Sequence, residues 1–302
     1  MIKNCNVCVI GGAGFLGSHL VNHLIEDRFC NVLVLDNLIT GYKDFIHHKA
    51  TFEWCDITHS ESQLRKLFEV YKIDYIFNYA AEPYIPVSFA RPLHVFDINA
   101  RGALMIMNAG QDAGVKGILQ VSSAEIYGDA PNHIINEEWP ARPHSTYGAS
   151  KLAIDLLIQS AWKERKTPVI AMRQFNCIGE RETHPYIVPE VIKQIDSPEF
   201  SGVIRLGNNS FRDFQYAGDA VRMAVELLEK GSFGDVYNMG SEKGIKIYDL
   251  AYLIAEIMGK EIKIEVDQSR VRPWEIWHLQ SDNSKLFKII EYRPTVTLRE
   301  SL

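Results

Sequence analysis

A tyrosine and a lysine four positions apart, Tyr147 and Lys151, are the side chains of this sequence best suited to moving a proton. They stand at the start of a segment with helical periodicity, and residues i and i+4 lie on the same face of a helix. The ammonium group of Lys151 is therefore expected under the phenol of Tyr147. Together with the positively charged ring of an oxidised cofactor bound nearby, it favours the phenolate and lowers the pKa of the phenol. Such a tyrosine can take the proton of a substrate hydroxyl while an oxidised cofactor takes the hydride. In isolation the same pattern also occurs as an incidental pair on an exposed helix.

The segment Ser122-Ser-Ala-Glu-Ile-Tyr-Gly128 adds polar side chains directly after an apolar run. The carboxyl end of a parallel strand faces the ligand cleft. Ser123 is therefore expected to hydrogen-bond the hydroxyl that Tyr147 deprotonates, and Glu125 is expected to reach a neighbouring carbon. The alternative for both serines is a capping or turn role.

A glycine-rich segment supplies the site for the hydride acceptor. The sequence GGAGFLG, residues 11–17, follows directly on a short β-branched apolar run and leads into a helical pattern. Gly11 suits the tight turn, Gly14 lets a pyrophosphate approach the backbone, and Gly17 lets the helix pack closely on its strand. Backbone N–H groups and the helix N-terminus then face the pyrophosphate. The segment predicts a dinucleotide site, with a plain strand-to-helix turn as the alternative.

Asp36 indicates which dinucleotide is bound. It ends a second apolar run, residues 31–35, at roughly the twenty-residue distance from the glycines that is typical of a ribose-binding carboxylate. A carboxylate there accepts hydrogen bonds from ribose hydroxyls and repels a 2′-phosphate. The sequence therefore predicts NAD and not NADP.

The composition limits the classes of partner and compartment. A net charge of −6 and a pI near 5.9 argue against nucleic acid or an anionic membrane as the main partner. The sequence has neither an apolar stretch of membrane-spanning length nor a signal-peptide pattern. Its five cysteines are an odd number, typical of a reducing compartment, so a cytoplasmic protein is expected. Cys5 and Cys8 form a C-x-x-C beside the first strand, where we expect buried small hydrophobic side chains, and no metal site is predicted.

Apolar runs and helical segments alternate up to Arg173, which predicts right-handed βαβ units and a Rossmann-like doubly wound α/β fold with a parallel sheet. Beyond this point the rhythm breaks, and a smaller C-terminal lobe is expected to cap the open end of the sheet. We predict an NAD-binding domain over residues 1–175 and a substrate-binding lobe over residues 176–302, interleaved with the core as one body. The expected strands are 7–10, 32–35, 75–78, 118–121, 169–172, 213–216 and 236–238, and the expected helices are 17–28, 61–71, 95–113, 149–163, 219–229 and 248–258.

Together these segments resemble the extended short-chain dehydrogenase/reductase family, and within it the NAD-dependent nucleotide-sugar epimerases and dehydratases. The resemblance rests on GGAGFLG, Asp36, SSAEIYG and YGASK, with Ala80-Ala81 and Asn99. It continues through residues 173–179, Arg212-Asp-Phe and Arg272-Pro, so it spans nearly the whole chain. The departures from the family pattern, Glu180 after Gly179 and Trp274-Glu275 after Arg272-Pro, leave the sugar and the base undetermined.

The resemblance implies a set of site residues. The catalytic residues are Tyr147, Lys151, Ser123 and Glu125. Asp56 and Ile57 lie beside the adenine and Lys151 bonds the nicotinamide ribose, in an NAD site formed by Gly11, Gly14, Phe15, Leu16, Gly17, Asp36, Asn37, Asp56, Ile57, Ala80, Ala81, Asn99, Ser122, Tyr147 and Lys151. Asn176, Arg212 and Arg272 face the nucleotide diphosphate, and residues 186–189 close over the ligand, in a substrate site formed by Glu82, Asn176, Tyr186, Val188, Pro189, Arg212 and Arg272.

The helices over 95–113 and 149–163 carry apolar residues over more of their circumference than one sheet face requires. In the family these two helices pair across a two-fold axis, so the resemblance implies a homodimer through a four-helix bundle. The alternative is a well-packed monomer.

The resemblance also implies a reaction that begins with oxidation of carbon 4 of a nucleoside-diphosphate hexose. Glu125 matches the base of the 4,6-dehydratases, which removes the proton at carbon 5, so a 4,6-dehydratase is favoured. Ala124 replaces the acid or hydroxyl residue that usually precedes this glutamate, so Glu125 itself, Glu82 or a water must supply a proton to the leaving hydroxyl. The triplet Ser122-Ser-Ala is typical of epimerases, which keeps a 4-epimerase or 4-oxidoreductase as the alternative. A non-catalytic NAD-sensing module is a remote alternative, because such modules can dispense with Tyr147 and Lys151.

Overall fold

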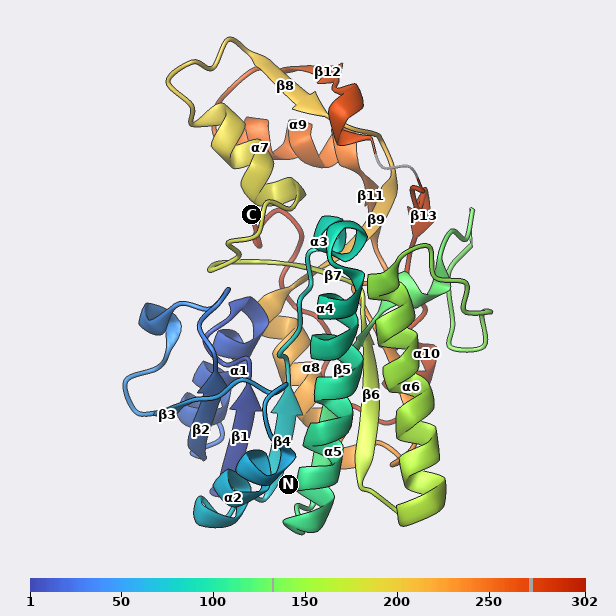
Figure 1. The fold of residues 1–302 in the computed structure, drawn as a ribbon. Helices are drawn as coiled ribbons and strands as arrows, with labels where there is room; N and C mark the ends of the chain where they lie inside the picture. The colour runs from blue at the N-terminus through green and yellow to red at the C-terminus, as the bar shows by residue number, and fades with distance from the viewer. Residues whose placement is uncertain (132, 272–273) are drawn as a thin grey trace.

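A sheet of seven parallel strands forms the centre of the molecule, in the order β10-β6-β5-β4-β1-β2-β3 (Figure 1). The computed structural model describes residues 1–131, 133–271 and 274–302. The predicted Rossmann-like α/β class is confirmed. Within this sheet the edge strand β3 was not expected, and β10 was expected in the C-terminal lobe. The strands are β1 Asn6–Ile10, β2 Asn31–Asp36, β3 Thr51–Trp54, β4 Tyr75–Asn78, β5 Gly117–Ser123, β6 Val169–Gln174 and β10 Val236–Met239.

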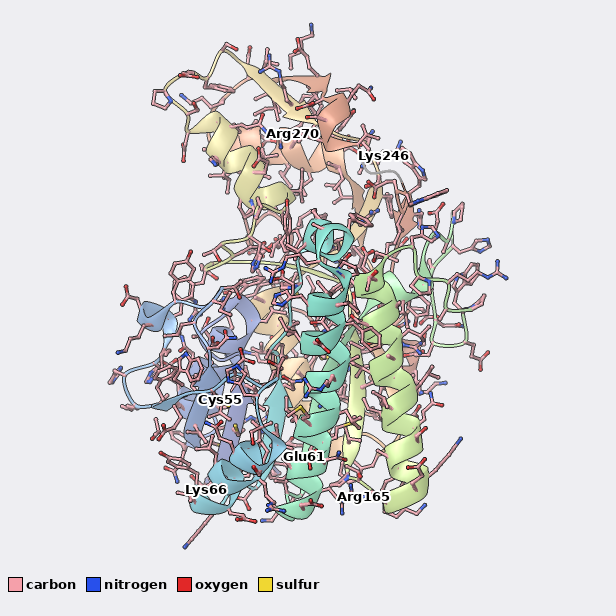
Figure 2. The ribbon with its side chains drawn as sticks, in the orientation of Figure 1. Cys55, Glu61, Lys66, Arg165, Lys246 and Arg270 are labelled. Carbon is pink, nitrogen blue, oxygen red and sulfur yellow. The ribbon has the colours of Figure 1, made fainter. Side chains whose placement is uncertain are left out.

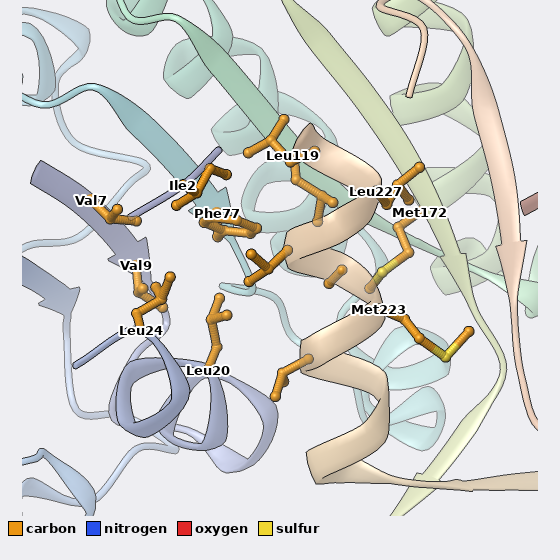
Figure 3. Close-up of a cluster of buried hydrophobic side chains, with 14 of the residues drawn as sticks. Ile2, Val7, Val9, Leu20, Leu24, Phe77, Leu119, Met172, Met223 and Leu227 are labelled. Atoms are coloured by element: carbon orange, nitrogen blue, oxygen red, sulfur yellow. The ribbon is translucent and has the colours of Figure 1, made fainter. Parts of the chain in front are cut away.

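Helices cover both faces of this sheet. On one face α1 packs beside α8, and Figure 3 shows Leu20 and Leu24 of α1 and Met223 and Leu227 of α8 within one buried apolar cluster over the strands. On the other face α2, α5 and α6 enclose a second buried apolar cluster. Strands buried on both sides explain why the β1 and β2 sequences are continuous apolar runs. The helices are α1 Phe15–Glu26, α2 Glu61–Val70, α5 Gly102–Asp112, α6 Thr146–Arg165 and α8 Ala217–Lys230.

The helix expected over 95–113 is interrupted. It comprises α4 (Pro92–Phe96), a π-helical turn (Asp97–Arg101) and α5. Within the π turn, Asn99 uses its amide to bind the backbone of Glu82 and the hydroxyl of Ser150 in α6. The extra residue of a π turn rotates a side chain relative to a regular helix, and here it points Asn99 at these partners.

Past β6 the chain builds a lobe beyond the carboxyl ends of the large sheet (Figure 1). A sheet β11-β9-β13, with β7 on β9, and a pair β12-β8 support a third apolar cluster with α7 and α9. The elements expected near 213–216, 219–229, 236–238 and 248–258 are confirmed as β9, α8, β10 and α9. The sequence predicts a domain boundary between residues 175 and 176. The elements α8 and β10 follow this position in the chain but pack on the large sheet, so the boundary stays a prediction. The remaining elements are α3 Ile85–Ala90, η3 Ala124–Tyr127, β7 Asn176–Ile178, α7 Ile187–Ile195, β8 Val203–Leu206, β9 Phe211–Tyr216, β11 Gly244–Lys246, α9 Ile247–Ile257, β12 Lys263–Val266, η4 Gln268–Arg270, β13 His278–Leu279, α10 Ser284–Phe287 and, before β3, η1 Lys43–Phe45.

Within the ranges given above, no helix has the length and apolar character needed to cross a bilayer. The cytoplasmic location expected from the sequence stays a prediction.

Candidate active site

The carboxyl ends of the strands open into a pocket of about 790 Å³ between the sheet and the lobe. The pocket spans the point between β1 and β4 where the strand order reverses, since β1 is followed along the sheet by β2 on one side and β4 on the other. Ligands of open parallel sheets bind at such a switch point. Most of the residues expected to bind a cofactor or a substrate line this one pocket.

The glycine segment forms a cradle that side chains would fill. Gly11 has φ +79°, and a Cβ on it would lie 2.6 Å from the backbone nitrogen of Ala80 at the end of β4. A Cβ on Gly17 would collide with the carbonyl oxygen of Gly11, and Gly14 is the N-cap residue of α1. The strand, turn and helix therefore approach as closely as only glycine permits. Backbone N–H groups at the start of α1 consequently face the pocket, which fits the pyrophosphate of a dinucleotide.

Asp36 stands beside this cradle at the end of β2. Its Oδ2 accepts a hydrogen bond from the N–H of Ala13 (3.0 Å) and its Oδ1 accepts one from the N–H of Leu38 (2.8 Å). Burial raises the pKa of this carboxyl, and these backbone bonds offset only part of the rise. These two bonds hold the carboxylate in place and leave lone pairs that can accept hydrogen bonds from ribose hydroxyls. Asp36 therefore fits the adenosine ribose of NAD.

A second carboxylate, Asp56, extends the same wall. It accepts hydrogen bonds from the amide of Asn37 (3.1 Å) and from the N–H and hydroxyl of Thr58 (2.9 and 2.7 Å). Burial raises the pKa of Asp56, but the bonds from Thr58 and Asn37 outweigh it and leave the pKa lowered. Asn37, Asp56 and Ile57 thus form a preorganised edge of the pocket, where the resemblance implies the adenine.

The residues that the sequence predicts for proton transfer lie close together. Ser145 caps the N-terminus of α6 by accepting from the N–H of Gly148 (3.0 Å), which fixes the turn that carries Tyr147. Tyr147 is only 9% exposed, and its phenol forms a hydrogen bond with the hydroxyl of Ser123 at the end of β5. The Nζ of Lys151 lies 5.9 Å from the centre of the Tyr147 ring and donates to the carbonyl oxygen of Val121 (2.8 Å).

The protein groups alone shift the pKa of Tyr147 in the direction opposite to the one expected, and Lys151 is not among the causes of the shift. Burial raises the pKa of the phenol to about 12, the bond to Ser123 opposes this, and the charges of Glu125 and Glu82 add to the rise. The ammonium of Lys151 points to Val121, and burial lowers its own pKa to about 8 against the attraction of Asp155. For both the Tyr147 phenol and the Lys151 ammonium, burial therefore has a larger effect on the pKa than the attraction predicted from their i, i+4 spacing.

We expect Lys151 to make stability depend on pH. Its pKa is about 8 in the folded chain and ordinarily 10.5, so the unfolded chain binds more protons between these values. Below pH 8 the buried ammonium therefore lowers the free energy of unfolding. This loss decreases as the pH rises from about 8 to 10.5. Lys151→Met should gain stability over the wild type at about pH 7, and by about pH 10 that gain should shrink by about 2 kcal/mol.

Urea unfolding of both proteins at the two pH values measures the gain. Lys163→Met, an exposed lysine of the same helix, is the matched control and should show no trend. A gain for Lys151→Met that stays constant with pH would contradict the lowered pKa of Lys151.

Two carboxylates flank the phenol. The backbone N–H of Glu125 donates to the hydroxyl of Ser123 (3.2 Å) in the short η3 turn, and the Oε1 of Glu82 accepts from the N–H of Tyr84 (3.1 Å). Both side chains line the pocket and both raise the pKa of Tyr147. The pocket therefore holds a phenol with two neighbouring acid or base groups.

The lobe contributes an ion pair that the sequence did not predict. The Nη2 of Arg212 lies 3.0 Å from the Oε1 of Glu275, and both side chains are less than a tenth exposed. Asn208 donates to the Oε2 of the same glutamate (2.6 Å). Arg212 lines the pocket as expected. Its guanidinium is already paired with the carboxylate of Glu275, so a diphosphate that binds Arg212 must lie beside this ion pair. The only signal in the sequence was the unusual Trp274-Glu275 dipeptide.

Part of the segment 186–189, which was expected to close over the ligand, lines the pocket. The hydroxyl of Tyr186 donates to the carbonyl oxygen of Pro83 (2.8 Å), which links the lobe to the loop after β4. Val188 lines the pocket, whereas Pro189 does not. Asn99 likewise lies behind the wall, where it holds the backbone of Glu82. Arg272 lies outside the described residues.

Several polar wall residues were missed because neither their type nor their spacing indicates that they face the pocket; Gln174 ends β6, and Glu190 lies in α7. Among the described residues, the buried Oδ1 of Asn176, which was expected, and the buried Oε1 of Gln174, which was not, have no hydrogen-bond partner, so both are acceptors available to a ligand. Burial raises the pKa of Glu182 to about 8. Arg270, labelled in the lobe in Figure 2, pairs with Glu190 of α7 (2.8 Å) at the pocket wall.

Comparisons with known proteins agree with this site. The chain is 30% identical over 274 residues to dTDP-D-glucose 4,6-dehydratase of Mus musculus, covering 89% of this chain and 76% of that protein. It is 32% identical over 278 residues to UDP-glucose 4-epimerase of Lacticaseibacillus casei, covering 85% and 82%. The crystal structure of UDP-glucose 4-epimerase with UDP-glucose from Thermotoga maritima matches with a TM-score of 0.90 at 26% identity, covering 98% and 96%.

The model of the NAD dependent epimerase/dehydratase family matches residues 7–240, which is more than half of the chain. This match confirms the resemblance expected from the sequence. The chain belongs to the NAD dependent epimerase/dehydratase family, and NAD is its cofactor.

Proposed function

We propose that this NAD-dependent nucleotide-sugar enzyme oxidises carbon 4 of a nucleoside-diphosphate hexose and continues as a 4,6-dehydratase. The observation that carries the proposal is the meeting of Tyr147, Ser123 and Glu125 in the pocket that also holds the glycine cradle. Ser123 orients the C4 hydroxyl, and Tyr147 takes its proton as a phenolate while the C4 hydride leaves. Burial opposes this form of Tyr147, and the positive nicotinamide of bound NAD would favour it. Bound NAD supplies the hydride acceptor and returns the same hydride later.

Glu125 is suited to the second stage. The ketone at carbon 4 acidifies the proton at carbon 5, and a carboxylate within reach of that carbon removes it. The hydroxyl at carbon 6 then leaves as water once it has received a proton. Hydride returned to carbon 6 and a proton added at carbon 5 would then give a 4-keto-6-deoxy sugar.

Glu82 is our candidate for the acid that protonates the leaving hydroxyl. Ala124 is buried and has no proton to donate, whereas the Glu82 carboxyl lines the pocket close enough to raise the pKa of Tyr147. Its backbone is fixed by Asn99 and one carboxyl oxygen by the N–H of Tyr84. Two carboxyl groups around one reacting sugar can divide the acid and base roles.

A 4-epimerase is the second candidate, favoured by the alanine at position 124 and by similarity to an epimerase at 32% identity. Incubation with UDP-glucose and dTDP-glucose in D₂O, followed by NMR, separates the two reactions. A 4-keto-6-deoxy product with deuterium at carbon 5 supports the dehydratase. A C4 epimer without solvent deuterium overturns it in favour of the epimerase.

We also infer a homodimer. Large apolar side chains are exposed on adjoining helices: Leu93 (80% exposed) and Phe96 (43%) on α4, and Leu156 (57%) on α6. A monomer gains nothing from leaving such a patch in water. Light scattering at micromolar concentration should give twice the chain mass of 34.4 kDa, and Leu156→Glu should halve it. Val266→Glu, on the exposed strand β12 of the lobe, should leave the mass unchanged. A monomeric wild type would contradict the inference.

A further inference from the structure

Two thiols meet at the end of the sheet opposite the pocket. The sulfur atoms of Cys5 and Cys30 lie 3.8 Å apart. Cys5 precedes β1 and Cys30 precedes β2, neighbouring parallel strands whose first residues, Asn6 and Asn31, pair with each other. The N–H of Asn31 donates to the carbonyl oxygen of Cys5 (3.0 Å), so the backbones are already joined at this point.

The backbone before each cysteine makes a tight turn that presents the thiols to each other. Asn4 and Phe29 both have positive φ, +51° and +55°. Such a conformation is uncommon for a residue as large as phenylalanine and persists only when its surroundings hold it. The N–H of Asn4 donates to the carbonyl oxygen of Arg28, and that of Cys30 donates to the carbonyl oxygen of Leu24, which hold both turns. The two thiols therefore face each other across a fixed geometry.

The two thiols differ in reactivity. A hydrogen bond from Cys5 lowers the pKa of the Cys30 thiol, with help from backbone N–H groups and the charge of Arg28, while the pKa of Cys5 is raised. Cys30 is only 7% exposed but lines a surface pocket of about 360 Å³, so a small oxidant can reach it. A low-pKa thiolate beside a second thiol is the arrangement of a reactive cysteine with a resolving partner.

The other three cysteines lack this arrangement. Burial raises the pKa of Cys8, Cys55 and Cys177. Cys8 is fully buried, as expected from the sequence, whereas the expectation of a buried hydrophobic role for Cys5 is wrong because Cys5 is half-buried and faces Cys30. The C-x-x-C pattern was therefore a coincidence of spacing, and the partner of Cys5 lies on the next strand.

We propose that Cys5 and Cys30 form a reversible intramolecular disulfide when the protein meets hydrogen peroxide. The Cys30 thiolate attacks one peroxide oxygen, which forms an S–O bond, breaks the O–O bond and releases hydroxide. The Cys5 sulfur then attacks the Cys30 sulfur, which forms the S–S bond, breaks the S–O bond and releases water after transfer of the Cys5 proton. Two thiols lose two electrons in total, and one peroxide is reduced to two waters.

The disulfide would clamp the cofactor-binding unit without touching its chemistry. It closes a loop over residues 5–30, which contains β1, the glycine turn and α1. The thiols precede strands of five and six residues, so at about 3.3 Å per residue they lie roughly 17–20 Å from the carboxyl ends of these strands. Restricting the unfolded chain by a loop of this size should raise the melting temperature by about 5 °C.

The test treats the reduced, full-length protein with hydrogen peroxide and follows it by alkylation and peptide mass spectrometry. We expect one Cys5–Cys30 cross-linked peptide, simultaneous loss of both thiols, a melting temperature raised by about 5 °C, and reversal of all three by dithiothreitol. Cys5→Ser should stop at a Cys30 sulfenic acid that dimedone traps, and Cys30→Ser should leave Cys5 unreacted. Cys177→Ser is the matched control and should behave like the wild type.

Three results would overturn the proposal: a disulfide between chains, Cys30 passing to sulfinic acid while Cys5 stays reduced, or a cross-link that leaves the melting temperature unchanged. If a serine variant does not fold, the peptide map and melting curve of the wild type still decide. None of these measurements depends on a sugar substrate, so they stand apart from the proposed reaction.

Discussion

Tyr147→Phe is expected to lower the rate of hydride transfer from a nucleotide sugar by about a thousandfold. The variant keeps the ring that fills the buried position, but it removes the only atom of this side chain that can accept the C4 hydroxyl proton. Ser123 alone remains beside that hydroxyl, and a serine is a far weaker base. Single-turnover absorbance of the reduced nicotinamide measures the step directly, because it reports the first oxidation before any later chemistry.

The design of this experiment separates chemistry from binding. Tyr75→Phe, at the opposite end of β4, is the matched control and should transfer hydride at the wild-type rate. NAD affinity should be nearly unchanged in Tyr147→Phe, because the cradle around Gly11 and the carboxylate of Asp36 stay intact. Hydride transfer in Tyr147→Phe at a rate close to wild type would contradict the assignment of the base.

Glu125→Gln is expected to slow elimination by at least about a hundredfold while sparing the first oxidation. Glutamine has the size of glutamate and can keep its place in the η3 turn, since the turn is held by the backbone N–H of residue 125. It cannot take the proton from carbon 5. The variant should therefore accumulate the 4-keto sugar and the reduced cofactor, which NMR and absorbance measure in the same sample.

The controls for this second variant identify the partner acid. Glu164→Gln, an exposed glutamate on α6, should leave both stages unchanged. Glu82→Gln should retain exchange of the carbon 5 proton with D₂O but lose water elimination, if Glu82 is the acid. Elimination by Glu125→Gln at the wild-type rate would remove Glu125 from the reaction and favour an epimerase.

Much of the site could be predicted from the sequence because its signals are local. The glycine turn, Asp36 and the Tyr147–Lys151 spacing each describe a few adjacent residues whose backbone geometry follows from residue type. The parallel sheet followed from the alternation of apolar runs with helical periodicity. In a parallel sheet the carboxyl ends of all strands lie on the same side, and the segments that follow them line a single pocket.

Other features depend on contacts between residues far apart in the chain. Asn99 turned out to support Glu82 and Ser150 through a π turn that no local pattern in the sequence indicates. Strand β10 joins the large sheet although it follows most of the lobe. The contacts of Asn99 and the position of β10 both depend on which surfaces pack together in the folded chain. No local pattern in the sequence indicates these contacts.

The sequence by itself determined the fold class and the NAD cofactor, because backbone conformation and hydrophobic period are properties of short segments. It also predicted the residues that we propose for proton transfer. Only the tertiary structure decided the raised pKa of Tyr147, the engagement of Arg212 by Glu275 and the meeting of Cys5 with Cys30. Burial and electrostatic interaction fall off over a few ångströms in space, and distance in space is not distance along the chain.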